Sequence, residues 1–201
     1  MFEDKPGADD NASGVAGVIE TARILAAEKA RLKNTVEFVF YTLNEAPFSG
    51  TEEMGSYMHA KAAAKQSEQI KSIYILENIG YYDSSFIQDY PIGLKWMYPS
   101  HGNFIAAVGN LQSREMTADF CSAMKSLNQL QCERLIAPSF VQAMEFSDHN
   151  NYWAFDLPAI VITDTGTYRN KNIHTDQDII DKLDVEKMGQ VVNGLVQAIL
   201  K

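Results

Sequence analysis

Residues 6–15 read Pro-Gly-Ala-Asp-Asp-Asn-Ala-Ser-Gly-Val, an acidic turn flanked by glycines that leads directly into an amphipathic segment. Asn11 and Ser13 are residue types that cap helix N-termini well. The spacing of the apolar residues that follow predicts a helix over residues 13–31. Its expected apolar stripe consists of Val15, Val18, Ile19, Ala22, Leu25 and Ala26.

Asp9 and Asp10 stand side by side in this turn, and their carboxylates repel each other. They have two interpretations. Acidic residues favour the positive end of a helix, which would make them simple capping charges. Carboxylate oxygens are also hard metal ligands, and a bound cation would remove the repulsion.

The composition is that of an ordinary globular protein of one domain, with 201 residues, 46% hydrophobic and 21% charged. The net charge of −9 argues against nucleic acid and anionic membranes as partners. No run of about 18 apolar residues predicts a membrane span. Residues 2–5 resemble an internal stretch of a polypeptide more than a natural N-terminus, so we expect the domain to be N-terminally incomplete. The compartment stays open, and a signal sequence upstream would imply export, for example to the periplasm.

Two cysteines, Cys121 and Cys132, lie eleven residues apart without a CxxC pattern. They have two interpretations: a disulfide in an exported protein, or two buried free thiols.

Strand-like and helix-like segments alternate along the chain. We expect strands at residues 35–41, 70–76, 104–108 (or a helix start), near 135 and at 158–163, helices at 53–67, 114–129, 147–155 and 185–200, and loops at 44–51, 80–103 and 164–181. This alternation predicts an α/β fold: a single domain with a mostly parallel mixed sheet and helices on both faces.

Three polar segments come directly after predicted strands: Asn44-Glu45, Glu77 and the loop that contains His174. Ligands of open α/β sheets bind at the carboxyl ends of the strands. The three segments are therefore expected to share one site.

The segment Gly-Ala-Asp-Asp-Asn-Ala-Ser-Gly before an apolar helix resembles the metal-binding turn of the M28 family of zinc peptidases. That family includes dizinc aminopeptidases and the related single-zinc glutaminyl cyclases. The resemblance implies a zinc aminopeptidase-like fold in which Asp10 binds, and can bridge, zinc. Further pieces of the family pattern follow in order as far as His174, so the resemblance covers nearly all 201 residues.

The stretch Leu-Asn-Glu-Ala-Pro-Phe at 43–48, ahead of Met-Gly-Ser, resembles the family's Glu-Glu-Pro-Pro-Phe segment. There the first Glu is the general base and the second binds metal. A gap-free alignment places Asn44 at the base position and Glu45 at the ligand. A shift of one residue would make Glu45 the base and place Ala46 at the ligand; we favour the gap-free alignment.

Glu77 and His174 complete the ligand set that the resemblance implies. Glu77, in Leu-Glu-Asn-Ile-Gly, resembles the strand-end acidic ligand, although a strand-end carboxylate facing water is the simpler interpretation of this residue alone. His174, in Asn-Ile-His-Thr-Asp-Gln-Asp, resembles the late His-Thr motif. Asp178 and its neighbours are candidates to hold the other nitrogen of this ring.

Ser147-Asp148-His149 also resembles a family segment. Neighbouring residues on a helix do not face one another, so it is not a catalytic triad. We interpret Asp148 and His149 as residues that support the ligands or the substrate, or that are purely structural, and Asp9 as a residue that supports the ligands or the substrate. Tyr168 and Arg169 precede His174 and are candidates to stabilise an oxyanion, with a solvated loop as the alternative. His59 and His101 match no pattern and are expected on the surface.

The family's further His ligand lies in a His-x-Asp strand upstream of the turn, and nothing before Pro6 supplies it. We therefore expect one or two zinc ions. Asp10, Glu45 and His174 suffice for one ion, whereas Asp10 and Glu77 are too few to bind a second tightly.

The resemblance implies a hydrolase of the aminopeptidase class, in which metal-activated water attacks the carbonyl of a peptide or small aminoacyl substrate. An amide at position 44 cannot accept a proton at neutral pH, so weak or absent activity is expected. The alternatives are a non-catalytic peptidase-fold binding protein and a glutaminyl-cyclase-like acyltransferase, which needs only one zinc.

Overall fold

The computed structural model describes residues 5–65, 70–91, 93–128, 130–136 and 147–201. Its centre is a four-stranded sheet with the order β1-β6-β4-β5, and a second sheet pairs two short strands, β2 and β3. The strands are β1 (Ile73–Leu76), β2 (Asp83–Ile87), β3 (His101–Gly102), β4 (Phe104–Gly109), β5 (Gln131–Ile136) and β6 (Ala159–Thr163).

Two of the three pairings in the main sheet are parallel: β1 runs parallel to β6, and β4 runs parallel to β5. β4 and β6 are antiparallel, with Ala106 opposite Thr163. The prediction of a mostly parallel mixed sheet is confirmed.

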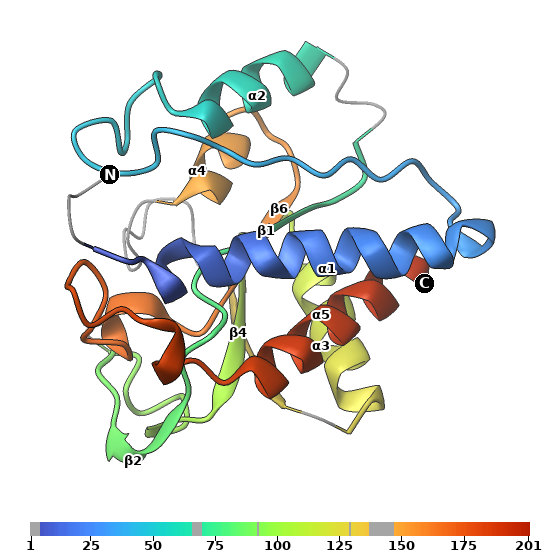
Figure 1. The fold of residues 1–201 in the computed structure, drawn as a ribbon. Helices are drawn as coiled ribbons and strands as arrows, with labels where there is room; N and C mark the ends of the chain where they lie inside the picture. The colour runs from blue at the N-terminus through green and yellow to red at the C-terminus, as the bar shows by residue number, and fades with distance from the viewer. Residues whose placement is uncertain (1–4, 66–69, 92, 129, 137–146) are drawn as a thin grey trace.

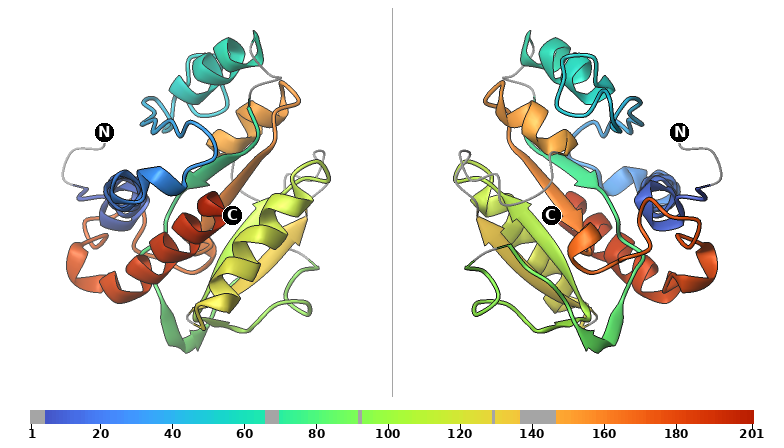
Figure 2. Two further views of the ribbon diagram at one scale, coloured as in Figure 1. Left: turned by 90° about the vertical axis from the view of Figure 1, so that its right-hand side faces the viewer. Right: turned by 90° about the vertical axis from the view of Figure 1, so that its left-hand side faces the viewer.

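Helices cover both faces of this sheet (Figures 1 and 2). Successive strand residues point to opposite faces, so Leu76 packs with α3 and α5 while Ile75 packs toward α2 and α4. The helices are α1 (Gly14–Ala27), α2 (Gly55–Ala63), α3 (Arg114–Ser126), α4 (Asp148–Trp153) and α5 (Val185–Leu200), joined by the short turns η1 (Ala8–Ser13), η2 (Lys29–Arg31), η4 (Gly166–Tyr168) and η5 (Ile180–Lys182). Among the described residues no helix combines the length and the apolarity needed to cross a bilayer.

A disulfide joins Cys121 in α3 to Cys132 in β5, with their Cα atoms 5.2 Å apart. It ties α3 to the edge strand over which that helix packs. Of the two interpretations of the cysteines, the structure supports the disulfide.

The polar side chains of the N-terminal turn have other hydrogen-bond partners than the predicted helix cap. Neither Asn11 nor Ser13 caps α1. Asn11 Nδ2 instead donates to the Leu76 carbonyl oxygen at 3.0 Å, and Ser13 Oγ donates to the Asp9 carbonyl oxygen at 2.7 Å. A Cβ atom on Gly14 would lie 2.4 Å from the Leu76 oxygen, so only glycine lets α1 approach β1 this closely.

The predicted apolar stripe of α1 is partly wrong. Leu25 is buried, but Val15 and Ile19 are 42% and 57% exposed. The buried face of the helix consists of Gly14, Gly17, Thr21 and Leu25, because small residues allow contact with β1 and α5.

The strand predicted over residues 35–41 is wrong. This segment is extended, but it pairs with no strand among the described residues. A strand needs a neighbour for its backbone hydrogen bonds, and a groove separates this segment from β1.

Other differences concern the ends of elements. The expected loop at 80–103 carries β2 and β3, the loop at 164–181 carries η4 and η5, and the helix predicted over 53–67 spans only Gly55–Ala63. Residues 66–67 and 129, which ended two predicted helices, lie outside the described residues.

Candidate metal centre

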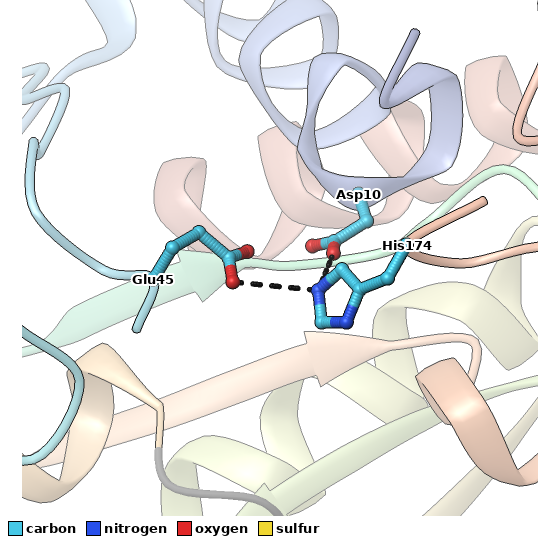
Figure 3. Close-up of side chains that lie close together, drawn as sticks. All are labelled: Asp10, Glu45 and His174. Carbon is cyan, nitrogen blue, oxygen red and sulfur yellow. Dashed lines mark ion pairs between the residues drawn. The ribbon is translucent and has the colours of Figure 1, made fainter. Parts of the chain in front are cut away.

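Three side chains from distant parts of the sequence converge at the carboxyl end of β1. Asp10 comes from η1, Glu45 from the loop before α2, and His174 from the loop after η4. His174 Nε2 lies 2.9 Å from Asp10 Oδ2 and 3.4 Å from Glu45 Oε2 (Figure 3). One ligand atom from each residue lies within 4.8 Å of the other two, which is close enough for one ion to contact all three.

Asp178 fixes the turn that carries Asp10. Its carboxylate accepts hydrogen bonds from the backbone N–H groups of Asp9, at 2.9 Å, and Asp10, at 3.1 Å. Its carbonyl oxygen accepts from the Ala8 N–H group at 3.0 Å. Asp178 is 2% exposed and lies four residues after His174. It therefore connects the chain segments of two candidate ligands, although it was predicted to hold the His174 ring.

Asp9 is buried beside this turn and points away from the three donors. Its Oδ1 accepts from the Gly80 N–H group at 2.9 Å, and its Oδ2 accepts from Asn170 Nδ2 at 2.8 Å. Burial raises the pKa of the Asp9 carboxyl, and the hydrogen bond from Asn170 opposes this rise. Asn170 could not be identified from the sequence, because an asparagine in a polar loop carries no distinctive signal.

Burial raises the pKa of the Asp10 carboxyl to about 6. The nearby Glu45 carboxylate adds to this rise, whereas His174 and a hydrogen bond from Asn78 oppose it. Two carboxylates that face one imidazole nitrogen repel each other unless a cation lies between them. A catalytic zinc site has three nitrogen or oxygen ligands from the protein and an open position, so these residues fit one zinc ion.

Glu77 lies outside this set of three. It follows β1 and is half-buried, and its Oε2 accepts a hydrogen bond from Ser147 Oγ. It lines the same groove as Asp10, Glu45 and His174. Its role as a ligand stays a prediction.

Asn44, which the resemblance places at the position of the general base, lies next to Asp148 at the start of α4. Burial raises the pKa of the Asp148 carboxyl, and hydrogen bonds from the Ser56 and Asn44 side chains oppose the rise. Both Asn44 and Asp148 line the groove that contains the three donors. The hydrogen bonds of Asp148 thus run to Ser56 and Asn44, and its predicted role in support of the ligands stays a prediction.

His149 points into the protein and packs edge-on against Trp153, with ring centroids 4.5 Å apart. Burial lowers the pKa of its imidazole to about 3, so the ring is neutral. Its Nδ1 is buried without a hydrogen-bond partner. These contacts suit the structural interpretation of His149.

Tyr168 and Arg169 do not line the groove that contains the three donors. Arg169 is fully buried, and its Nη1 donates to the Phe104 carbonyl oxygen at 2.8 Å. Its Nε donates to Gln88 at 2.9 Å, and Tyr168 borders a separate small apolar pocket beside Gln88. The solvated-loop alternative is wrong for Arg169, because its guanidinium lies in the core.

Of the two unassigned histidines, His101 is exposed as expected. His59 is half-buried, and its Nδ1 lies 2.7 Å from the Tyr152 hydroxyl oxygen. The surface prediction for His59 is therefore wrong. The partner that holds it is distant in sequence and could not be identified from the pattern.

The sheet, the helices on both faces and the acidic turn together define a metallopeptidase fold. The model of Peptidase family M28 matches residues 1–199, and the chain belongs to this family.

Curated relatives include the Escherichia coli (strain K12) protein described as "Uncharacterized protein YfbL", which is 45% identical over 193 residues. That match covers 95% of this chain and 58% of the relative. Leucine aminopeptidase 1 of Ajellomyces capsulatus (strain NAm1 / WU24) is 26% identical over 194 residues, covering 92% of this chain and 44% of the relative. The chain thus spans about half the length of these relatives.

Solved structures show the same fold. The Legionella pneumophila LapA aminopeptidase superposes with a TM-score of 0.72 at 21% identity, covering 97% of this chain and 46% of that one. An Acidobacteriales bacterium glutaminyl cyclase gives a TM-score of 0.62 at 18% identity, covering 96% and 61%.

Proposed function

We propose that residues 1–201 form one peptidase-like domain that binds zinc through Asp10, Glu45 and His174 and hydrolyses peptides or small aminoacyl compounds weakly, as an aminopeptidase-class enzyme. The observation that carries the proposal is the convergence of these three donors within 4.8 Å. Membership of peptidase family M28 supports a peptide substrate.

A zinc ion at this position supplies Lewis acidity, which lowers the pKa of water and polarises a carbonyl group. The residues of the chain determine how fast the reaction can proceed. Asn44 can donate a hydrogen bond to a substrate or accept one from it, but its amide cannot take up the proton that a general base must remove. Loss of a general base costs about 10²–10⁴-fold in rate, so we expect slow turnover.

A second zinc ion is not part of the proposal for these 201 residues. Asp10 and Glu77 would give it two protein ligands, which is fewer than zinc sites use. Because the chain spans about half the length of its relatives, the activity and metal content of the longer proteins are a separate matter.

The disulfide between Cys121 and Cys132 supports location in an oxidising compartment such as the periplasm or the exterior. Two free thiols would instead have been compatible with a reducing compartment.

The experiment compares the zinc-loaded chain with His174→Ala on leucine p-nitroanilide. Slow hydrolysis by the wild-type chain that His174→Ala abolishes would support the proposal. The presence of Asn44 favours a second candidate, a peptide-binding domain without catalysis. Zinc-dependent binding of a peptide without cleavage would identify it. Cyclisation of a peptide with N-terminal glutamine, without hydrolysis of the anilide, would instead identify an acyltransferase.

A further inference from the structure

Asn78 is a buried polar residue at the carboxyl end of β1, directly after Glu77. It is 6% exposed, and it does not line the groove that contains the three donors. Its φ angle is +53°, in the left-handed region that asparagine and glycine tolerate better than other residues. Glycine would meet this backbone requirement without burying an amide group. The side chain of Asn78 therefore needs another explanation.

The backbone of Asn78 connects the acidic turn to the ends of two strands. Its N–H group donates to Asn11 Oδ1 at 3.0 Å, and Asn11 directly follows Asp10. Its carbonyl oxygen accepts a hydrogen bond at 2.6 Å from the N–H group of Asp164, the residue after β6. These bonds hold position 78 beside Asp10, whichever side chain stands there.

The side-chain amide of Asn78 lies against the Asp10 carboxylate. Its hydrogen bond lowers the pKa of the Asp10 carboxyl, against the larger effect of burial. The Nδ2 atom is buried and has no other hydrogen-bond partner among the described residues. A buried donor without an acceptor is costly, and an ionised carboxylate only accepts hydrogen bonds. The nitrogen of the amide therefore faces Asp10.

Two residues thus hold Asp10 in different ways. Asp178 accepts hydrogen bonds from the backbone of the turn, whereas Asn78 acts on the carboxylate itself. A hydrogen bond to a carboxylate restricts its rotation before a ligand arrives. Restricting a group in its bound orientation reduces the entropy that binding costs.

We propose that Asn78 is a positioning residue of the metal centre, whose amide donates a hydrogen bond to Asp10 and keeps that carboxylate in the orientation that binds the ion. The inference rests on the proposed function, because it concerns the same zinc site. Asn78 itself is not a ligand, because the atom that faces the site is a donor. Partners that orient a metal ligand change metal affinity about 10- to 100-fold.

The test measures zinc affinity by isothermal titration of the metal-free 201-residue chain, with Asn78→Gly and Asn78→Leu beside wild type. Both variants lose the donor. Glycine suits the backbone angle and leaves a space, whereas leucine keeps a branched side chain that fills it. We expect each variant to bind zinc about tenfold more weakly than wild type.

Asn128→Gly and Asn128→Leu are the matched controls, because Asn128 is exposed and has a φ angle of +49°. They impose the same changes on a left-handed backbone outside the metal centre. We expect both to bind zinc as tightly as wild type.

The cobalt-loaded proteins give a second readout, because the visible absorption of Co²⁺ depends on the arrangement of its ligands. We expect an altered spectrum in both Asn78 variants and the wild-type spectrum in both Asn128 variants. A lower melting temperature of the metal-free Asn78 variants, with unchanged zinc affinity and cobalt spectrum, would overturn the inference in favour of a role in folding alone.

Wild-type zinc affinity in Asn78→Leu would also overturn it, because only the volume at position 78 would then matter. These outcomes leave the proposed metal centre intact. Absence of zinc binding by the wild-type chain would instead refute the metal centre, and the inference with it.

Discussion

Asp178 holds the backbone of the turn that carries Asp10. One buried carboxylate accepts two backbone hydrogen bonds from the turn, and charged acceptors make hydrogen bonds stronger than neutral ones. Neither Asn11 nor Ser13 caps the helix that follows; the turn is held further by hydrogen bonds from Asn11 to Leu76 and from Gly80 to Asp9.

We predict that Asp178→Asn weakens zinc binding about 10- to 100-fold, as for other residues that orient metal ligands. The amide keeps the shape of the side chain but replaces one acceptor oxygen by a donor that faces a backbone N–H group. Isothermal titration with zinc measures the effect. Asp176→Asn, on the exposed part of the same loop, is the control for the change in charge. A lower melting temperature with unchanged zinc affinity would show that Asp178 is only structural.

The slow hydrolysis that we propose is attributed to Asn44. We predict that Asn44→Glu raises kcat for leucine p-nitroanilide by about 10²–10⁴-fold, because it restores a proton acceptor. Asn44→Gln extends the side chain without this ability and serves as the control. Similar rates for the Glu and Gln variants would refute the assignment of position 44 to the base.

At the scale of elements, α4 carries a buried titratable group. The pKa of His149 is about 3 in the folded protein and 6.5 as a free side chain. Between these values the unfolded chain binds a proton that the folded chain does not. The contribution of His149 to stability is therefore complete above pH 6.5 and decreases as the pH falls toward 3.

We predict that His149→Phe flattens the decrease of unfolding free energy below pH 6.5, by up to about 1.4 kcal/mol per pH unit. Phenylalanine preserves the edge-on contact with Trp153 and does not titrate. Urea denaturation at a series of pH values measures the slope. Comparison with wild type isolates His149 from buried carboxyls such as Asp164, whose raised pKa acts in the opposite direction. Parallel curves for the two proteins would contradict the prediction.

The disulfide ties α3 to β5 across a separation of eleven residues. Closing a loop of this length lowers the conformational entropy of the unfolded chain, which stabilises the folded state by about 3 kcal/mol. We predict that the double variant Cys121→Ser/Cys132→Ser loses about this much unfolding free energy. Reductant should destabilise wild type and leave the double variant unchanged. Insensitivity of wild type to reductant would show that the bond does not form.

Elements with a strong periodic pattern could be predicted closely from the sequence. The helix at Val185–Leu200 was predicted to the residue, because its apolar spacing is regular and Asp184 caps it. Residues 35–41 carry an equally clear strand pattern, and the prediction failed because a strand also requires a neighbour. That neighbour depends on the rest of the sheet, which local sequence does not specify.

The candidate site was predictable where the sequence resembles a family motif. The resemblance to the M28 family pointed to Asp10, Glu45 and His174, and the structure brings these three side chains together. Arg169 could not be placed in this way. Its burial depends on acceptors at Phe104 and Gln88, which lie more than 60 residues away along the chain.

At the scale of the whole molecule, the candidate centre depends on three chain segments that come together only in the folded domain. Ligand binding to the folded state alone stabilises that state. Zinc should therefore raise the unfolding temperature of the whole domain, and loss of any one donor should remove this effect.

The most direct test of the central claim is zinc titration of the metal-free 201-residue chain by calorimetry, with Glu45→Gln, His174→Ala and Glu77→Gln beside wild type. We predict one zinc ion per chain for wild type and for Glu77→Gln, and loss of tight binding in the other two variants. Wild-type binding by Glu45→Gln or His174→Ala, or no binding by the wild-type chain, would contradict the assignment of Asp10, Glu45 and His174 as the metal centre.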